Sequence, residues 1–442
     1  MKKPNVIFFF SDQQRYDTAG CYGQKLNITP NLDKLADEGV KYEYAFTCQP
    51  VCGPARACLQ TGVYATENGC FRNDIALPSD TKTIAHYFNA AGYDTAYIGK
   101  WHLASNNAVN NSNCEEDFTE KPVPKERRGG YNYWMAADVL EFTSHGYDGY
   151  VYNTENEKVE FKGYRVDCIT DYALDYIKNQ ENPFFLFLSH IEPHHQNDRN
   201  CYEGPKGSKE RFENYDIPPD LEGTAGDWRE NYPDYLGCCN SLDYNLGKII
   251  SLLKEKGIYE DTVIIYTSDH GSHFKTRNGE YKRSCHENSI RIPMIIRGPG
   301  FQKGEVKNEL VSLMDIPPTL LYSAGMEKPS CMKGTPLQLL SSENPADWQS
   351  EVFLQVSESQ VGRAVRTEKW KYFVSAPDKD PWNDSKSDIY VEELLFDLEN
   401  DPTERNNLIN DAKYDEIKKE LSEILIKRMV SAGETAPRIV KI

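Results

Sequence analysis

The feature that most constrains the fold is a series of continuous apolar runs that recurs along the chain. Strands buried on both faces of a parallel sheet carry such runs, whereas strands with one solvated face alternate apolar and polar residues. Segments with helical periodicity separate the runs, as in a doubly wound α/β domain. The sequence therefore predicts an α/β fold with a doubly wound, mostly parallel sheet flanked by helices. The runs are Val6–Phe10, Thr95–Ile98, Phe184–Leu188, Val263–Thr267 and Met294–Ile296.

Capping residues and glycines delimit four predicted helices between these strands. An N-cap side chain satisfies free N–H groups of the first turn, and a glycine readily adopts the left-handed conformation that ends a helix. Residues 106–163 show weak periodicity and are expected to form loops and a short insertion that borders the functional site. The predicted helices run from Thr29-Pro30 to Gly39, from Asp80 to Gly92, from Asp167 to Lys178 and from Ser241 to Lys256.

The C-terminal part has a different pattern. Residues 325–347 contain Gly and Pro and are interpreted as a linker, and an amphipathic helix is predicted over residues 414–431. The chain is therefore divided into a large domain, residues 1–345, and a smaller α+β domain, residues 346–442, with an antiparallel sheet. Its predicted strands are Val352–Gln355, Trp370–Val374 and Leu394–Leu398.

Charge argues against one class of partner. The 442 residues carry a formal net charge of −18, and no cluster of Lys and Arg forms a basic stripe, so nucleic acid is not an expected partner. A chain this acidic does not attract polyanions in bulk. An anionic substrate must therefore be captured by a local positive site.

The sequence gives no indication of a membrane partner, because no apolar run approaches the ~20 residues that a membrane span needs. Residues 5–10 follow Met1–Pro4 directly and are interpreted as a core strand, since the stretch is too short for a signal peptide and lacks a small-residue cleavage site. The expected location is cytoplasmic. The 12 cysteines are dispersed, without zinc-ligand spacing, and are expected to be reduced thiols.

The most informative local motif places a Pro two residues after a cysteine and an Arg two residues further on. Pro54 suits the first position of a helix and Gly62 its C-terminal cap, so Cys52 is expected at a helix N-terminus, where free N–H groups and the helix dipole favour an anion. Arg56 lies one turn along the same face. The alternative is a buried structural cysteine in front of an ordinary helix. The motif is Cys52-Gly53-Pro54-Ala55-Arg56, followed by Leu59-Gln60-Thr61-Gly62.

This motif resembles the signature of the type I sulfatases, a family of the alkaline phosphatase-like superfamily. The segment Phe396–Glu404 resembles one commonly found near sulfatase C-termini. In that family a maturation enzyme oxidises the cysteine to formylglycine, which acts as its hydrate. The resemblance implies the same fate for Cys52, with one hydroxyl of the hydrate attacking sulfur and the other then expelling sulfate. It also implies that Arg56 helps to offset the charge on the transferred group.

The resemblance further implies a metal site beside Cys52. Asp12 and the Asp269-His270 pair each follow a predicted strand, and ligands of open α/β sheets bind beyond the carboxyl ends of strands. Mostly oxygen ligation favours Ca²⁺, and the imidazole of His270 leaves Mg²⁺ or Mn²⁺ open. The alternative for each aspartate is a helix cap after a strand. The residues that align with sulfatase metal ligands are Asp12, Gln13, Asp269 and His270, joined by the formylglycine oxygen of Cys52.

Other matching residues are expected to contact the sulfate group. Lys100 and His102 stand in Gly-Lys-Trp-His-Leu, which resembles the sulfatase segment that contacts formylglycine and sulfate. The alternative is a solvated lysine beside a loop histidine. Lys282 is expected to bind the ester oxygens and Arg283 to be a solvated neighbour, while Asn73 is expected as a polar contact to the sulfate.

His194 follows the run Phe184–Leu188 in a Pro-His pair, where the family places a substrate-facing histidine. We predict that it is the general acid that protonates the departing alcohol, a role worth typically ~10²–10⁴ in rate. The adjacent His195 is the alternative for this role. His195 and Arg199 are also predicted substrate contacts.

The predicted activity is hydrolysis of a sulfuric ester with release of inorganic sulfate. Tyr131, Tyr133 and Trp134, with the polar residues 195–199, either line a sugar pocket or pack as an ordinary loop. A small sulfated carbohydrate is the expected substrate and an aryl sulfate the alternative. Two other functions stay open. One is a phosphonate or phosphate monoester hydrolase of the same superfamily, which the Lys100 and His102 pair disfavours, and the other is an inactive sulfoglycan-binding relative.

Overall fold

A large, mostly parallel sheet forms the centre of the molecule. The computed structural model describes residues 3–106, 116–341 and 348–441. The main sheet has the order β11-β2-β10-β8-β1-β7-β3-β4-β5-β6, with the short β9 paired to β2. Strands β8, β1, β7, β3 and β4 are parallel, while β10, β5 and β6 run antiparallel to their neighbours. The predicted fold class is confirmed. The strands are β1 Asn5–Ser11, β2 Val40–Phe46, β3 Asp94–Lys100, β4 Tyr133–Ala137, β5 Asp148–Asn153, β6 Lys158–Lys162, β7 Phe184–Ser189, β8 Thr262–Ser268, β9 Arg291–Ile292, β10 Met294–Arg297 and β11 Glu305–Ser312.

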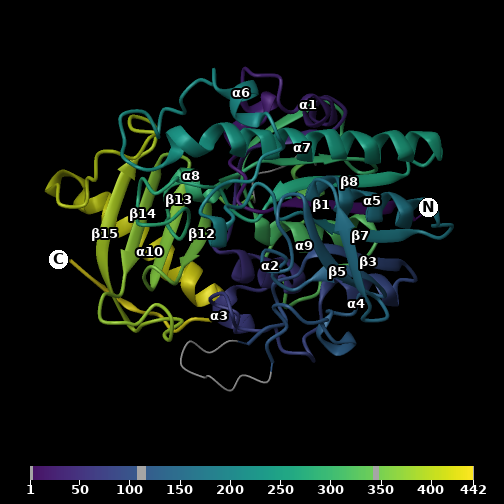
Figure 1. Cartoon of the computed structure of the whole chain (residues 1–442). Helices are drawn as coiled ribbons and strands as arrows, with labels where there is room; N and C mark the ends of the chain where they lie inside the picture. Colours follow the sequence, from purple (N-terminus) through teal and green to yellow (C-terminus); the bar gives the residue numbers. More distant parts are fainter. Residues whose placement is uncertain (1–2, 107–115, 342–347, 442) are drawn as a thin grey trace.

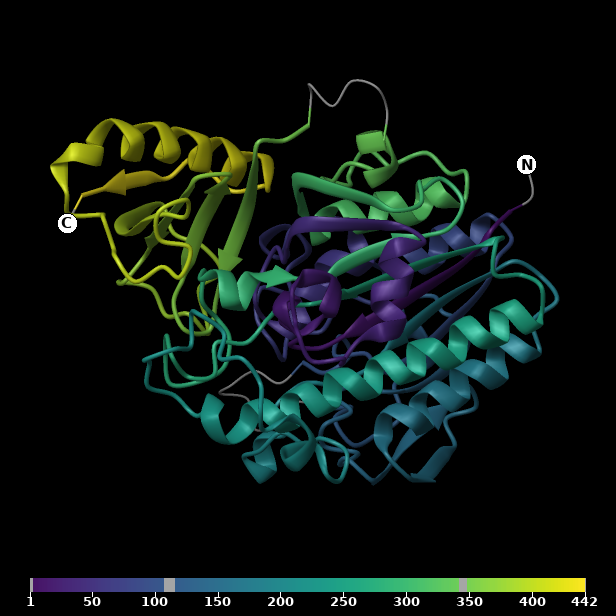
Figure 2. The ribbon, with the colours of Figure 1, turned by 90° about the horizontal axis from the view of Figure 1, so that it is seen from above.

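Helices cover both faces of this sheet, which explains the continuous apolar runs. Val6, Phe8 and Phe10 of β1 belong to one hydrophobic cluster, and Ile7 and Phe9 belong to the other. Helices α2, α4 and α9 contribute to the first cluster and α1, α5 and α7 to the second, so neither face of the central strands meets water. Figure 2 shows the sheet between these two layers. The helices are α1 Pro30–Asp37, α2 Cys52–Thr61, α3 Ala65–Asn68, α4 Ile84–Ala90, α5 Arg165–Lys178, α6 Ser208–Phe212, α7 Trp228–Glu255, α8 Glu287–Ile290 and α9 Ile316–Ser323.

Two predicted helix starts are wrong. Thr83, not Asp80, caps α4 through a capping box with His86. Helix α7 begins at Trp228, well before the predicted Ser241. Its first half contains Pro233 and Gly237. Both residue types weaken helices, so this half of α7 was not predicted as helical.

The segment at residues 106–163 is more regular than expected. Its strand β4 pairs in parallel with β3 and extends the main sheet, and β5 and β6 form a hairpin at the sheet edge. The hairpin strands expose many residues, so they carry no continuous apolar run. Residues 107–115 lie outside the described residues.

The C-terminal part forms a five-stranded sheet of order β12-β13-β14-β15-β16, antiparallel except for the β15–β16 pair. Helix α10, Asp415–Ser431, packs on it through Leu421, Leu425 and Met429, so the predicted α+β unit is confirmed. Figure 1 shows this unit beside the main sheet. The strands are β12 Glu351–Val356, β13 Gly362–Thr367, β14 Trp370–Ser375, β15 Ile389–Asp397 and β16 Arg438–Val440, of which β13 and β16 were not predicted.

The connection between the two units is not a simple linker. Leu337 and Leu340 of the 3₁₀ helix Leu337–Ser341 are buried against the main core. The predicted domain boundary at residue 345 lies outside the described residues. Within the described part of the chain, none of the helices combines the length and the apolar character needed to cross a lipid bilayer.

Candidate active site

Helix α2 presents Cys52 at its N-terminus, beside the carboxyl ends of the central strands. Cys52 is the first residue of the helix, so Pro54 is its third residue rather than its first. Gly62 ends the helix with φ 73°, the left-handed conformation expected of a glycine cap. The first free N–H group is that of Gly53, which donates to Asn73 Oδ1 at 2.9 Å. Cys52 is 1% exposed.

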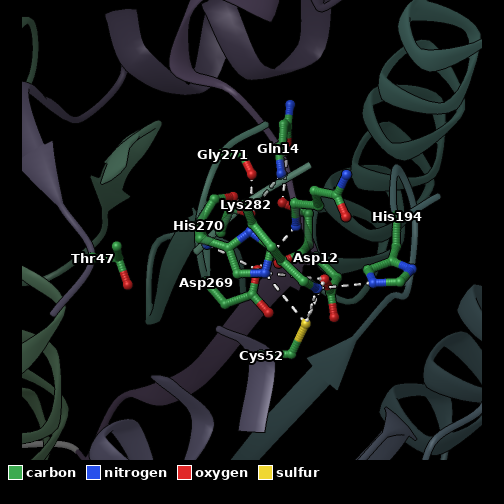
Figure 3. Close-up of polar contacts among 12 residues, drawn as sticks. Asp12, Gln14, Thr47, Cys52, His194, Asp269, His270, Gly271 and Lys282 are labelled. Carbon is green, nitrogen blue, oxygen red and sulfur yellow. Dashed lines mark hydrogen bonds and ion pairs between the residues drawn. The ribbon is translucent and has the colours of Figure 1, made fainter. Parts of the chain in front are cut away.

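The sulfur of Cys52 lies among polar groups from three other segments. Its Sγ atom is 2.7 Å from Lys282 Nζ, 3.2 Å from His270 Nε2 and 3.3 Å from Asp12 Oδ1. Figure 3 shows dashed lines from the sulfur to these side chains, which lie above it in the view. Burial alone would raise the pKa of the thiol, but Lys100, Lys282 and His270 hold it well below its ordinary value. The site therefore stabilises a negative charge at this position.

Asp12 follows β1 and forms the most strongly paired carboxylate of the site. Its Oδ2 accepts hydrogen bonds from Lys100 Nζ at 2.7 Å and Arg56 Nη2 at 3.0 Å. Burial opposes ionisation, but these two cations keep the pKa of Asp12 below its ordinary value. Asp12 is therefore a carboxylate at neutral pH, and its other oxygen faces Cys52.

Asp269 and His270 follow β8 and complete a group that fits a cation. One ligand atom from each of Asp12, Cys52, Asp269 and His270 lies within 4.8 Å of the others. Asp269 Oδ2 is buried without a hydrogen-bond partner, and burial together with Asp12 raises the pKa of Asp269 to about 7. His270 Nδ1 lies 2.9 Å from the Gly271 carbonyl, which can only accept, so Nε2 is free to act as a ligand. Among the described residues, Asp269 Oδ2 accepts no hydrogen bond and has only the ion pair with Arg56 Nη2 at 3.7 Å, and His270 Nε2 points toward Cys52 Sγ. A divalent cation would satisfy both atoms.

Gln13 lies beside this group in a strained backbone conformation, with φ 71°. Its backbone N–H donates to Asp269 Oδ1 at 2.9 Å, and its side-chain Nε2 donates to Tyr202 Oη at 2.8 Å. The amide nitrogen is therefore occupied, which leaves the carbonyl oxygen as the atom available to a cation. Its role as a ligand stays a prediction.

Arg56 and Lys100 lie beneath Cys52. Arg56 Nη1 donates to the Lys100 carbonyl at 2.9 Å and to Ser189 Oγ at 2.7 Å, so the guanidinium joins α2 to the ends of β3 and β7. Lys100 is the last residue of β3 and is 1% exposed. The two cations offset the charges of Asp12 and Cys52, and Lys100 also borders the cavity described below.

The loop after β3 places His102 against Cys52. Asp138, which follows β4, accepts hydrogen bonds from three successive backbone N–H groups at residues 103–105, and its own carbonyl accepts from His102 N at 2.6 Å. These hydrogen bonds hold the loop in a conformation in which His102 has a φ of 61°. A hydrogen bond from His102 contributes to the low pKa of Cys52.

His194 lies on the opposite side of Lys282. Its Nε2 is 3.0 Å from Lys282 Nζ, and because an ammonium can only donate, this nitrogen accepts. Burial and the positive Lys282 lower the pKa of His194. Its Nδ1 lies 4.0 Å from the buried carboxylate of Glu141, a residue that the sequence analysis did not identify.

A cavity of about 710 Å³ opens above these groups. Its floor holds Cys52, Lys100, His102, His194 and Lys282, all of which were predicted from the sequence. Its walls come from loops and from the C-terminal unit, which contributes Trp382. The unpredicted wall residues include Asp74, Glu120, Glu141, Phe142, Lys275, Glu280, Tyr281 and Trp382.

A chain of hydrogen bonds links the C-terminal unit to the N-terminus of α2. Glu358 Oε1 accepts from Asn73 N at 2.6 Å, and Asn73 in turn accepts from Gly53 N. The other oxygen of Glu358 pairs with Arg283, next to Lys282. The expectation that Arg283 is a solvated neighbour is wrong, because its guanidinium is 20% exposed and pairs with two carboxylates.

Several predicted substrate contacts differ in their placement. His195 borders the cavity and stacks on Tyr281 with ring centroids 4.2 Å apart. Arg199 is 49% exposed, pairs with Glu203 and does not border the cavity, so the structure does not bring it to the other residues. The aromatic residues 131, 133 and 134 do not border it either; Tyr131 and Trp134 are buried in the main core.

The fold and the floor of the cavity together define a class of protein. A buried thiol at a helix N-terminus lies beside a group of side chains that could hold a cation, and several ammonium and guanidinium groups surround it at the ends of parallel strands. Such an arrangement is typical of a hydrolase that acts on anionic esters. Sequence models give the family. The model of the sulfatase family matches residues 4–326, and a model described as "N-sulphoglucosamine sulphohydrolase, C-terminal" matches residues 279–431. The chain belongs to the sulfatase family and is a sulfuric ester hydrolase.

Individual relatives agree over nearly the full chain. An ulvan-active sulfatase of Formosa agariphila is 30% identical over 98% of this chain and 82% of its own length. An N-acetylglucosamine-6-O-sulfatase of Bacteroides thetaiotaomicron is 27% identical over 96% of this chain and 86% of its own length. A solved structure in complex with its substrate D-glucosamine-2-N,6-O-disulfate has a TM-score of 0.78 at 23% identity and covers 99% of both chains, which shows a shared fold. Members of the family typically use a formylglycine and a metal ion.

Proposed function

We propose that this protein releases sulfate from a small sulfated carbohydrate, with Cys52 oxidised to formylglycine by a maturation enzyme and with Ca²⁺ as the bound cation. The two relatives described above act, by their names, on ulvan and on a sulfated N-acetylglucosamine, and both are sulfated carbohydrates. A cavity of about 710 Å³ is within the size range of small-molecule sites.

The floor of the cavity is suited to hold one sulfate ester. Lys282 and Lys100 present ammonium groups beside the nucleophile, and Arg56 supports them from below. Such fixed charges stabilise a transition state whose negative charge builds up on the transferred group. Asp12, Asp269, His270 and Gln13 would hold the cation, which together with the hydrated aldehyde supplies an activated oxygen nucleophile at the position of Cys52.

Proton transfer to the leaving alcohol is assigned to His194. Lys282 donates to its Nε2, so the two side chains share a hydrogen bond across the mouth of the sulfate site. The carboxylate of Glu141 lies 4.0 Å from the other ring nitrogen, Nδ1. His102 is assigned to hold the hydroxyl groups of the hydrate in place, since it borders the cavity together with Cys52 and helps to lower the pKa of that thiol.

The observation that carries the proposal is the contact of Cys52 Sγ with Lys282, His270 and Asp12 at the helix N-terminus. The test is mass spectrometry of the Cys52 peptide, followed by initial rates on sulfated mono- and disaccharides, an aryl sulfate and a phosphonate ester. We expect an aldehyde at Cys52 and the highest kcat/KM on a sulfated sugar. A marked preference for the phosphonate ester would contradict the proposal, and an unmodified thiol in an inactive protein from a host with the maturation enzyme would indicate a binding protein.

A further inference from the structure

Beyond Lys282 and His194, the walls of the cavity carry many charges, and we call this region the outer half. Its charged side chains determine which groups a substrate can carry next to the sulfate that reacts. Four are acidic and two are basic. They are Asp74, Glu120, Glu141, Lys275, Glu280 and Arg283.

Both cations of the outer half are already neutralised by the protein. Lys275 Nζ lies 3.1 Å from a carboxylate oxygen of Asp227. Arg283 forms ion pairs with both Glu280 and Glu358. Three carboxylates therefore face these two cations, so neither cation offers an unbalanced positive charge to a ligand.

The remaining carboxylates have no such compensation. Within the described part of the chain, no Lys or Arg forms an ion pair with Asp74, Glu120 or Glu141. Glu141 accepts a hydrogen bond from the Asn197 backbone at 2.8 Å, and its closest basic atom is His194 Nδ1 at 4.0 Å. The outer half thus has a surplus of negative charge, although the floor below it is built to hold an anion.

The uncharged surface of the outer half is largely aromatic. Phe142 is 52% exposed, and Tyr281 and Trp382 also border the cavity. The guanidinium groups of Arg72 and Arg283 each lie 5.7 Å from the centroid of the Trp382 ring. Aromatic faces of this kind pack against apolar C–H surfaces such as those of a neutral sugar ring.

We propose that the outer half selects sulfated sugars whose other substituents are neutral or cationic, such as an N-acetyl or a free amino group, and disfavours a second sulfate or a carboxylate. The inference rests on the proposed function and narrows its substrate class. A like charge brought close to an uncompensated carboxylate in water weakens binding by about fivefold at 4 Å. One sulfate is held by the floor, but a second anionic group on the same sugar would face these carboxylates.

Three sugars test this inference because they share one ring and one ester. Glucosamine 6-sulfate, N-acetylglucosamine 6-sulfate and N-sulfoglucosamine 6-sulfate differ only in carrying a positive, neutral or negative group on nitrogen. Calorimetric titration of the Cys52→Ala variant, loaded with Ca²⁺, measures binding without turnover. We expect the N-sulfated sugar to bind at least about tenfold more weakly than the N-acetylated one at low salt, with a smaller difference at high salt. Equal affinities, the reverse order, or no binding of any of the three would overturn the inference.

Variants locate the source of the discrimination. Glu120→Gln and Asp74→Asn should each reduce the N-acetyl to N-sulfo affinity ratio by about threefold, since exposed charges act weakly one by one. Glu420→Gln makes the same charge change at an exposed position of α10 outside the cavity and should leave the ratio unchanged. An N-acetyl to N-sulfo affinity ratio that stays unchanged in the double variant, which combines Glu120→Gln with Asp74→Asn, contradicts the inference. A ratio that falls equally in Glu420→Gln contradicts it as well.

A parallel assay separates this inference from the proposed function. Sulfate release by the matured wild-type protein, from N-acetylglucosamine 6-sulfate and from 4-methylumbelliferyl sulfate, reports the sulfatase reaction itself. Lack of hydrolysis with the expected binding order would reject the proposed mechanism and retain the selectivity. Hydrolysis with the reverse binding order would support the proposed mechanism and reject the selectivity.

Discussion

The floor and the outer half of the cavity are built in different ways. The floor side chains of Asp12, Lys100 and Asp269 lie at or just after strand ends of the main sheet, are fully buried and make several contacts each. The outer half comes from loops and from the β14–β15 connection of the C-terminal unit, and it includes exposed groups such as Glu120 and Phe142. The sheet therefore fixes the positions of the floor groups, while under the proposed function the loops would determine which sugar reaches them.

A second comparison is between two buried thiols of α2, whose surroundings shift their pKa values in opposite directions. Lysines and a histidine surround Cys52 and lower its pKa. Cys58 lies six residues further along, where burial and the adjacent Cys48 thiol raise its pKa well above the ordinary value. A thiol becomes chemically useful through the charges that surround it, and burial by itself makes it inert.

The largest effect is expected at Cys52. Cys52→Ala removes the side chain that becomes the nucleophile, so kcat/KM for sulfate release should fall by at least about 10⁴-fold. Cys58→Ala on the same helix is the matched control. It should keep its turnover and lose about 1 kcal/mol of stability, read from denaturant unfolding. Substantial sulfate release by Cys52→Ala would show that another residue attacks the ester.

Two lysines of the cavity separate the floor from the outer half. Lys282→Met removes an ammonium that contacts the nucleophile, and kcat should fall by about 10²–10³. Lys275→Met removes an ammonium that already pairs with Asp227, and kcat/KM should change by less than about fivefold. Steady-state kinetics with one sulfated sugar compares the two variants. Similar losses would mean that the two regions are not functionally distinct.

Cation binding should depend on pH through Asp269. Its pKa of about 7 in the cation-free protein means that the carboxyl is protonated below neutral pH and has to lose that proton when the cation binds. The affinity for Ca²⁺ should therefore fall as the pH drops below 7, by up to about tenfold per pH unit. Calorimetry in two buffers of different ionisation enthalpy measures the proton released. Asp269→Asn should remove this proton release together with most of the affinity, and an affinity that does not vary with pH would contradict the assignment.

The smallest effect is expected at Trp382 in the outer half. Trp382→Ala removes an aromatic face, so KM for a sulfated sugar should rise about threefold to tenfold while kcat stays nearly constant. Trp382→Phe should restore part of the affinity. A fall in kcat without a change in KM would place Trp382 in the chemistry rather than in binding.

The floor was predictable because its residues occupy short, ordered patterns. The sequence alone shows a Cys at the start of a predicted helix that ends at Gly62. It also shows an aspartate directly after a buried strand. Parallel strands then bring these positions to one edge. The start of α4 was missed because Thr83 competes with Asp80 as a cap, and only the bonds with His86 distinguish the two.

The outer half was not predictable because its residues meet only in the folded chain. Asp74, Glu141 and Trp382 belong to segments far apart in sequence and have no spacing in common. Arg199 was predicted as part of the polar stretch 195–199, yet it forms an ion pair with Glu203, four residues further along the chain. Nothing in the sequence indicates that Glu358 pairs with Arg283, since both lie in loops without periodic pattern.

The link from Glu358 through Asn73 to Gly53 has a consequence for biosynthesis. A ribosome makes Cys52 early and Glu358 late, so the surroundings of the thiol close only after most of the chain has emerged. In the folded protein Cys52 lies at the bottom of a cavity of about 710 Å³, a volume typical of small-molecule sites. Under the proposed maturation, we therefore expect Cys52 to be oxidised in the growing or still unfolded polypeptide, and a molecule that folds before this step would keep its thiol.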